Sequence, residues 1–215
     1  MGYQMAIFDL DGVLVDTAKY HYLAWKKLAD QLGIDFTHED NERLKGVSRD
    51  RSLEILLEIG NLEHAFSAEQ KKAMATEKNE DYVTYIQQLT QDDLLPGSKA
   101  LLLDLRRRGI KTGLGSASKN APGILTRLGI TGLFDVIIDG NATQRAKPDP
   151  EVFLLGAQAL HIAPGDCVVF EDAQAGIEAA LAAGMTPIAV GSPQFLQGAV
   201  LYVADLSDEK IREMV

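Results

Sequence analysis

The regular alternation of short apolar runs with helical patterns, from residue 96 to residue 190, most constrains the fold. The predicted strands cover 111–115, 136–139, 167–170 and 186–190, and the predicted helices cover 98–108, 121–128, 150–160 and 173–183. A helix between two strands turns the chain so that the second strand runs parallel to the first, through a right-handed crossover. The chain is therefore predicted to be α/β, with a doubly wound parallel sheet that carries helices on both faces.

Two carboxylates follow the first predicted strand. Residues 3–8 form a short apolar run typical of a buried central strand, and Asp9 and Asp11 come where it ends. The carboxyl ends of parallel strands face the ligand crevice, and Gly12 allows the backbone to turn away. Two carboxylates in this place predict a site for a divalent cation. Taken alone, the tetrapeptide is equally compatible with a polar turn.

Residues 17–89 interrupt the alternation and have helical patterns instead. Apolar residues recur at three- and four-residue spacing from Tyr20 to Leu32, and further helices are predicted over 50–59 and 68–89. The candidates for the inner face of the last helix are Met74, Tyr82, Ile86 and Leu89. An insertion of this size after the first strand predicts a helical cap domain over residues 17–89. The α/β core then comprises residues 1–16 and 90–215.

Composition excludes several classes of function. The 215 residues carry a formal net charge of −10, which disfavours a nucleic-acid partner because phosphate backbones are neutralised by basic surfaces. No apolar run approaches the ~20 residues of a membrane span, and the N-terminus has no secretory pattern. We expect a cytoplasmic protein without membrane contacts. The single cysteine, Cys167, lies in an apolar run and is interpreted as a buried structural thiol.

A cationic loop lies between the first two predicted cap helices. Lys45, Ser48 and Arg49 place two cations and a hydroxyl within five residues, a set that suits a phosphate group. The alternative is that Ser48 caps the following helix and Arg49 lies on its solvated surface. His21 is similarly ambiguous, because a lone histidine on a helix is usually structural.

Four sets of polar residues are expected to meet at one edge of the sheet. Each set follows a separate predicted strand: Asp9 with Asp11, residues 116–120, Lys147, and Glu171 with Asp172. Any one of these sets could be a capped loop. Their convergence at the edge where ligands bind predicts an active site.

Motifs along essentially the whole chain carry a resemblance to a known family. They are DLDGV at 9–13, Thr17, His21, LKGVSR at 44–49, EKN at 77–79, SASKN at 116–120, KP at 147–148 and EDAQAG at 171–176. This set resembles the haloacid dehalogenase-type phosphotransferases, which have a Rossmann-like core. The cap sequence at 44–49 resembles in particular the β-phosphoglucomutase family. Gly113 and Gly115 depart from the more substituted strand expected before Ser116.

The resemblance and the needs of phosphoryl transfer imply roles for the residues at the strand ends. Asp9 is expected to be the nucleophile that forms an aspartyl-phosphate, and Asp11 to be the general acid and base. Ser116 and Lys147 are expected to complete the phosphate cradle. The expected ligands of Mg²⁺ are Asp9, the backbone carbonyl of Asp11, Glu171 and Asp172.

By the same resemblance, the cap and the loop at 116–120 bind the substrate. The expected substrate-binding residues are Thr17, His21, Trp25, Lys45, Gly46, Val47, Ser48, Arg49, Ser52, Lys78, Ala117, Ser118 and Asn120. The implied activity is interconversion of β-D-glucose 1-phosphate and D-glucose 6-phosphate through β-glucose 1,6-bisphosphate, by a monomer. Two alternatives stay open: a Mg²⁺-dependent sugar-phosphate phosphatase, and a catalytically silent protein that binds sugar phosphates.

Overall fold

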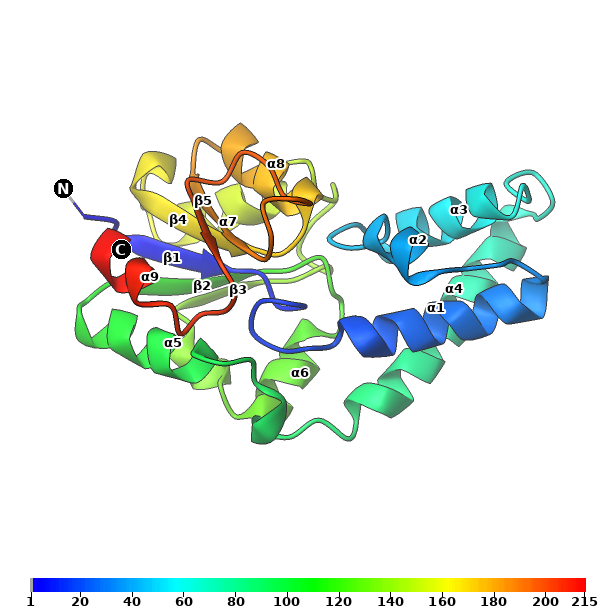
Figure 1. The fold of residues 1–215 in the computed structure, drawn as a ribbon, viewed down its shortest axis with the longest axis horizontal. Helices are drawn as coiled ribbons and strands as arrows, with labels where there is room; N and C mark the ends of the chain where they lie inside the picture. Colours follow the sequence, from blue (N-terminus) through cyan, green and yellow to red (C-terminus); the bar gives the residue numbers. More distant parts are fainter. Residues whose placement is uncertain (1) are drawn as a thin grey trace.

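A six-stranded parallel sheet forms the centre of the computed structural model, which describes residues 2–215 (Figure 1). The strands are β1 (Met5–Phe8), β2 (Lys111–Gly115), β3 (Val136–Ile138), β4 (Cys167–Glu171), β5 (Thr186–Val190) and β6 (Leu201–Val203). Their order is β3-β2-β1-β4-β5-β6, and each neighbouring pair is parallel. This is a doubly wound arrangement with β1 and β4 at its centre, so the predicted fold class is confirmed.

The side chains of β1 alternate between two apolar layers. The helices that cover the sheet are α5 (Ser98–Arg107), α6 (Ala121–Leu128), α7 (Glu151–Ala159), α8 (Gln174–Ala182) and α9 (Glu209–Met214). Ala6 and Phe8 belong to the apolar cluster that includes α5, α6 and α9. Met5 and Ile7 belong to the cluster on the other face, with α7 and α8. Burial on both faces explains why the central strands read as continuous apolar runs.

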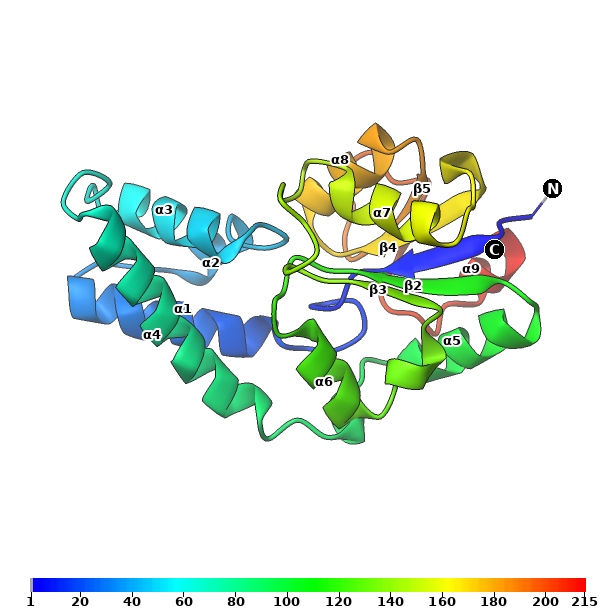
Figure 2. The same cartoon turned by 180° about the vertical axis from the view of Figure 1, so that it is seen from behind.

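A group of helices between β1 and β2 stands beside the sheet. It comprises α1 (Ala18–Leu32), α2 (His38–Glu42), α3 (Arg49–Ile59) and α4 (Ala68–Ile86). Helices α1, α3 and α4 and their connecting loops share an apolar cluster of their own, which includes Trp25, Phe36 and Leu56. Figures 1 and 2 show the group beyond the carboxyl end of β1. It therefore lies over the edge of the sheet where the polar residues were expected.

Several short elements were not expected from the sequence. They are α2, β6, α9 and the 3₁₀ turns η1 (Gln91–Asp93), η2 (Thr131–Leu133) and η3 (Pro164–Asp166). The last cap helix ends at Ile86 instead of Leu89, although Leu89 is still buried. A capping box between Thr37 and Asp40 begins α2, which is only five residues long. Elements this short have too few apolar residues to show a period.

Candidate active site

Three carboxylates meet at the carboxyl ends of the two central strands. Asp9 follows β1, Glu171 ends β4 and Asp172 comes next, and one oxygen from each lies within 4.8 Å of the others. Asp9 and Glu171 are buried. Gly12 makes room for this cluster: its φ is +79°, and a Cβ atom there would collide with the Asp172 carboxylate. A side chain at position 12 would therefore displace Asp172.

Lys147 is the buried cation of this cluster. Its Nζ atom donates to Asp9 Oδ1 at 2.6 Å and also to Glu171 Oε1. Burial lowers the pKa of Lys147, but the charges of Asp9 and Glu171 outweigh burial and raise that pKa above its ordinary value. Lys147 is therefore a permanent ammonium group that holds the Asp9 carboxylate in place.

The carboxylates of the cluster are costly to ionise together. Burial, followed by the charge of Asp9, raises the pKa of Glu171 to about 7 against the opposing effect of Lys147. Burial, followed by the charges of Glu171 and Asp9, raises the pKa of Asp172 well above its ordinary value. A hard divalent cation stabilises the ionised forms, and carboxylate oxygens are its preferred ligands. This donor set fits Mg²⁺.

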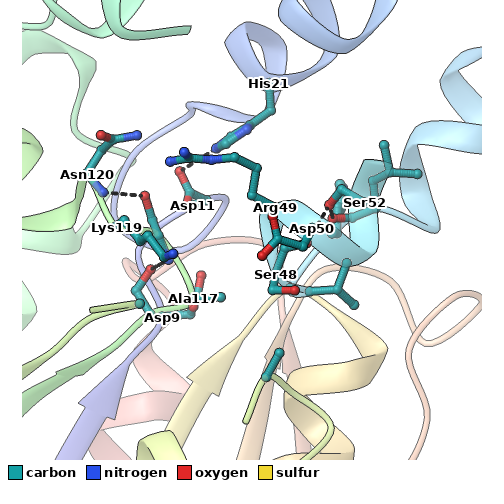
Figure 3. Close-up of a pocket in the computed structure, with 18 of the residues that line it drawn as sticks. Asp9, Asp11, His21, Ser48, Arg49, Asp50, Ser52, Ala117, Lys119 and Asn120 are labelled. Atoms are coloured by element: carbon teal, nitrogen blue, oxygen red, sulfur yellow. Dashed lines mark hydrogen bonds and ion pairs between the residues drawn. The ribbon is translucent and has the colours of Figure 1, made fainter. Parts of the chain in front are cut away.

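Asp11 has surroundings different from those of the three clustered carboxylates. Thr17 Oγ1 donates to Asp11 Oδ1. His21 Nε2 lies 3.8 Å from the same oxygen (Figure 3). Desolvation, followed by the negative charge of Asp9, raises the pKa of Asp11 to about 6. A carboxyl group with this pKa can both donate and accept a proton near neutral pH.

The helical group contributes two desolvated cations and a neutral histidine. Lys78 Nζ donates to His21 Nδ1 at 3.0 Å and lies 4.5 Å from the centroid of the Trp25 ring. Burial, followed by the charge of Arg49, lowers the pKa of Lys78 to about 7, and burial also lowers the pKa of Arg49. Burial and these two cations lower the pKa of His21, so its imidazole is neutral. Figure 3 shows the Arg49 guanidinium extending over Asp11 beside His21.

The loop before α3 brings the helical group against the sheet. Lys45 Nζ lies 3.9 Å from Asp172 Oδ2. Gly46 has a φ of +72°, and a Cβ atom on it would lie 3.0 Å from the Cβ atom of Ala173. Ser48 caps α3, because its hydroxyl accepts from a backbone N–H in the first turn. The alternative interpretation of Ser48 as a cap is thus confirmed, and Ser48 also lines the cavity described next.

A cavity of about 280 Å³ lies between the helical group and the sheet. Most of the predicted site residues line it: Asp9, Asp11, His21, Trp25, Lys45, Gly46, Val47, Ser48, Arg49, Ser52, Lys78, Ser116, Ala117, Ser118, Asn120 and Asp172. Thr17, Lys147 and Glu171 do not. In place of the expected contact with a substrate, Thr17 is completely buried and bonds to Asp11. Lys147 and Glu171 bond to each other next to Asp9.

The sequence matches the family model of the haloacid dehalogenase-like hydrolases over residues 3–184. The chain belongs to this family. It is 48% identical to the β-phosphoglucomutase of Bacillus subtilis, over 94% of this chain and 89% of the relative. The crystal structure of a β-phosphoglucomutase from Clostridium difficile has a TM-score of 0.94 at 46% identity, over 99% of this chain and 96% of the other. A phosphorylated carbohydrates phosphatase of Thermotoga maritima is 30% identical over 86% of this chain and 83% of its own.

Several residues at or beside the cavity of this haloacid dehalogenase-like protein were not among the predicted site residues, and two of them, Asn79 and Tyr82, contact predicted ones. Asn79 lines the cavity and accepts from Asn120 Nδ2 at 2.9 Å, which links α4 to the loop after β2. Tyr82 is completely buried and stacks on His21, with ring centroids 4.0 Å apart. The signal for Asn79 is its place directly after Lys78. Tyr82 was expected on the inner face of its helix, but only the packing of α4 on α1 places it beside His21.

Proposed function

We propose that this protein is a Mg²⁺-dependent β-phosphoglucomutase that interconverts β-D-glucose 1-phosphate and D-glucose 6-phosphate. The observation that carries the proposal is one cavity lined by two parts of the chain. The sheet contributes the lysine-held carboxylate Asp9, at what we call the core end, and the helical group contributes the cations Arg49 and Lys78, at what we call the cap end. A substrate that bears phosphate at either end needs a phosphoryl acceptor at one side and a phosphate-binding group at the other. The similarity to two β-phosphoglucomutases supports the choice of sugar.

The reaction proceeds in two half-reactions through phosphorylated Asp9. When β-glucose 1,6-bisphosphate phosphorylates the enzyme, a bond forms between a carboxylate oxygen of Asp9 and phosphorus as the bond between phosphorus and the sugar oxygen breaks. Protonated Asp11 gives its proton to the departing oxygen. In the reverse direction, Asp11 takes the proton of the attacking hydroxyl, and that hydroxyl accepts the phosphoryl group from Asp9. A pKa of about 6 suits Asp11 to both roles.

Lys147 and a metal ion stabilise the charges that gather at Asp9. The ammonium group of Lys147 fixes the orientation of the nucleophile through its bond to Asp9 Oδ1. Held by Asp9, Glu171, Asp172 and the backbone carbonyl of Asp11, Mg²⁺ would neutralise the charge of the carboxylates and of the phosphoryl oxygens. Ser116, buried at the end of β2, completes the cradle for the transferred phosphoryl group.

We further propose that residues 17–89 form a cap domain that closes over the core of residues 1–16 and 90–215. An aspartyl-phosphate reacts with a sugar hydroxyl or with water, so exclusion of water separates a mutase from a phosphatase. Lys45 and Gly46 already lie against Asp172 and Ala173 of the core. A second phosphate bound at Arg49 would hold the cap in this position.

A Mg²⁺-dependent sugar-phosphate phosphatase is the second candidate. The similarity to the Thermotoga maritima phosphatase favours it, because hydrolysis uses the same nucleophile, acid and metal. A catalytically silent binding protein would have no use for the buried pair of Asp9 and Lys147. The monomeric state and the cytoplasmic location remain predictions. No helix within residues 2–215 is long and apolar enough to cross a membrane.

The fate of the aspartyl-phosphate tests the proposed function. Purified protein with Mg²⁺, β-glucose 1-phosphate and a trace of glucose 1,6-bisphosphate is expected to form glucose 6-phosphate far faster than inorganic phosphate. Both products are measured in the same samples. Release of phosphate at the rate of substrate loss, without glucose 6-phosphate, would replace the mutase with the phosphatase.

A further inference from the structure

The hydroxyl of Tyr82 has no hydrogen-bond partner, although the side chain is completely buried. Among the buried side-chain nitrogen and oxygen atoms of residues 2–215, it is the one without a partner. A buried hydroxyl in this state costs folding free energy, because it has given up its bond to water and gained none. Phenylalanine would fill the same volume without that cost. Packing alone therefore does not account for a tyrosine at this position.

The surroundings of the Tyr82 hydroxyl connect it to Asp11. The ring of Tyr82 stacks on His21, whose Nε2 lies 3.8 Å from Asp11 Oδ1. Thr17 and Asp11 lie close enough to the hydroxyl to act on its pKa, but neither meets the geometry of a hydrogen bond with it. Burial, followed by the charge of Asp11, raises the pKa of Tyr82 well above its ordinary value, so the hydroxyl keeps its proton and can donate.

Thr17 connects Tyr82 to Asp11. Its hydroxyl has a single proton, which it donates to Asp11 Oδ1, and its oxygen can still accept. When Asp11 exchanges a proton with a sugar oxygen, the hydrogen bonds on its carboxyl group must change. The Tyr82 hydroxyl can then donate to the Thr17 oxygen, and the resulting chain of hydrogen bonds would fix Thr17 and Asp11 in place.

We propose that Tyr82 is a positioning residue that donates to Thr17 when Asp11 engages the acceptor, and so orients Asp11 for proton transfer. The inference rests on the proposed roles of Asp9 and Asp11. If Tyr82 has this role, only one of the two half-reactions depends on it. Acetyl phosphate needs no general acid, because acetate is a stable leaving group, so phosphorylation of Asp9 by this donor is independent of Tyr82. Transfer from Asp9 to any hydroxyl needs the base Asp11, and therefore needs Tyr82.

The test compares Tyr82→Phe with Tyr85→Phe, a matched control on the same helix. Tyr85 stacks on Tyr20 with centroids 5.9 Å apart, outside the cavity lining. Phosphorylation by acetyl phosphate and transfer from phosphorylated Asp9 to the sugar phosphate are timed separately by rapid quench. We expect Tyr82→Phe to slow the transfer about three- to tenfold, the worth of one hydrogen bond, and to leave phosphorylation unchanged. Tyr85→Phe is expected to change neither step.

A second comparison tests whether Tyr82 acts through Thr17. In a Thr17→Val background, Tyr82→Phe should cause no further loss of transfer, because the connecting hydroxyl is already gone. An additive loss would overturn the proposal. So would a Tyr82→Phe variant that transfers at the wild-type rate, whatever its melting temperature, since the hydroxyl would then have no role in transfer.

The same measurements separate this inference from the proposed function. If phosphorylated wild-type protein transfers only to water, the mutase proposal fails, while the effect of Tyr82→Phe on transfer to water still tests the role of Tyr82. If transfer to sugar is fast in the wild type and equally fast in Tyr82→Phe, the mutase stands and the role of Tyr82 fails.

Discussion

At the core end of the cavity the charged groups are carboxylates around one ammonium group, whereas at the cap end they are cations around a neutral histidine. Lys147 lies between Asp9 and Glu171, and these partners raise its pKa. Desolvation lowers the pKa of both Lys78 and Arg49, and the charge of Arg49 lowers the pKa of Lys78 further. The core end thus stabilises its own cation, and the cap end does not.

This difference indicates what each end needs. The core end holds more negative charge than Lys147 can balance, so it accepts a metal cation. The cap end holds positive charge without compensation, and a phosphate dianion would provide it. A ligand with a phosphate at both ends, bound together with Mg²⁺, satisfies both.

Loss of the nucleophile at the core end has the largest expected effect. An asparagine at position 9 cannot form an acyl phosphate, so Asp9→Asn should lower kcat by at least about 10³-fold. The measurement is turnover with saturating Mg²⁺, and thermal denaturation of the same sample serves as the control for folding. Near-normal turnover by Asp9→Asn would show that the core end is not the reacting end.

The core end could be predicted from the sequence, because the change from apolar to polar residues marks where each buried strand ends. Each apolar run gave the position of its polar successor, and a parallel sheet brings these successors together whatever the order of the strands. The order itself, with β6 at the far edge, could not be predicted, since β6 is three residues long. Gly115 was read as loosening its strand. In the structure the Phe153 ring packs so closely that a Cβ atom at Gly115 would lie 2.8 Å from it.

The cap end could be predicted only in part. Arg49 belongs to a recognisable sequence motif and Lys78 lies on α4. Within residues 2–215 neither forms an ion pair with a carboxylate, and this depends on how α1, α3 and α4 pack. Tyr82 was expected to face inward, and so it does. Its stacking on His21 follows from the packing of α4 on α1, between residues far apart in the chain. A helical period gives the buried face of a helix and says nothing about which polar group lies opposite.

Removal of the Arg49 guanidinium should harm the cap end alone. Arg49→Ala is expected to lower kcat/KM for glucose 1,6-bisphosphate about 10²-fold, the worth of two charge-assisted hydrogen bonds. Phosphorylation of Asp9 by acetyl phosphate should stay within about twofold, because this small donor does not reach the cap. Arg51→Ala is the matched control, since Arg51 bonds to Glu54 and Glu58 on the outer side of α3. Equal losses with both donors would contradict the assignment of phosphoryl transfer to the core end and phosphate binding to the cap end.

The charge of Lys78 should make substrate binding dependent on pH. Its pKa is about 7 because of burial and Arg49, and a bound phosphate would raise that pKa. The free enzyme therefore holds a charged Lys78 below pH 7 and a neutral one above it. Binding above pH 7 takes up a proton, so KM should rise up to about tenfold from pH 7 to pH 8.

Lys78→Met separates this effect from titration of the substrate phosphate. The variant should have a raised KM at pH 6 and no increase in KM between pH 7 and pH 8. Isothermal titration in buffers of different ionisation enthalpy gives the proton uptake directly. If wild type and variant take up the same number of protons at pH 8, Lys78 is not the titrating group.

The contact between the two ends should have the smallest effect. Asn120 donates to Asn79 at 2.9 Å, and this bond joins α4 of the cap to the loop after β2. Its loss weakens closure by about one hydrogen bond, so Asn79→Ala should raise hydrolysis of phosphorylated Asp9 about threefold to fivefold relative to transfer to sugar. Glu77→Ala, at an exposed position on the same helix, is the control.

Asn79→Ala and Asn120→Ala must also be combined, because Asn120 is proposed to bind substrate. If the bond acts by closing the cap, hydrolysis in the double variant should not exceed that of the more affected single variant, whereas additive increases would mean that the two amides act independently.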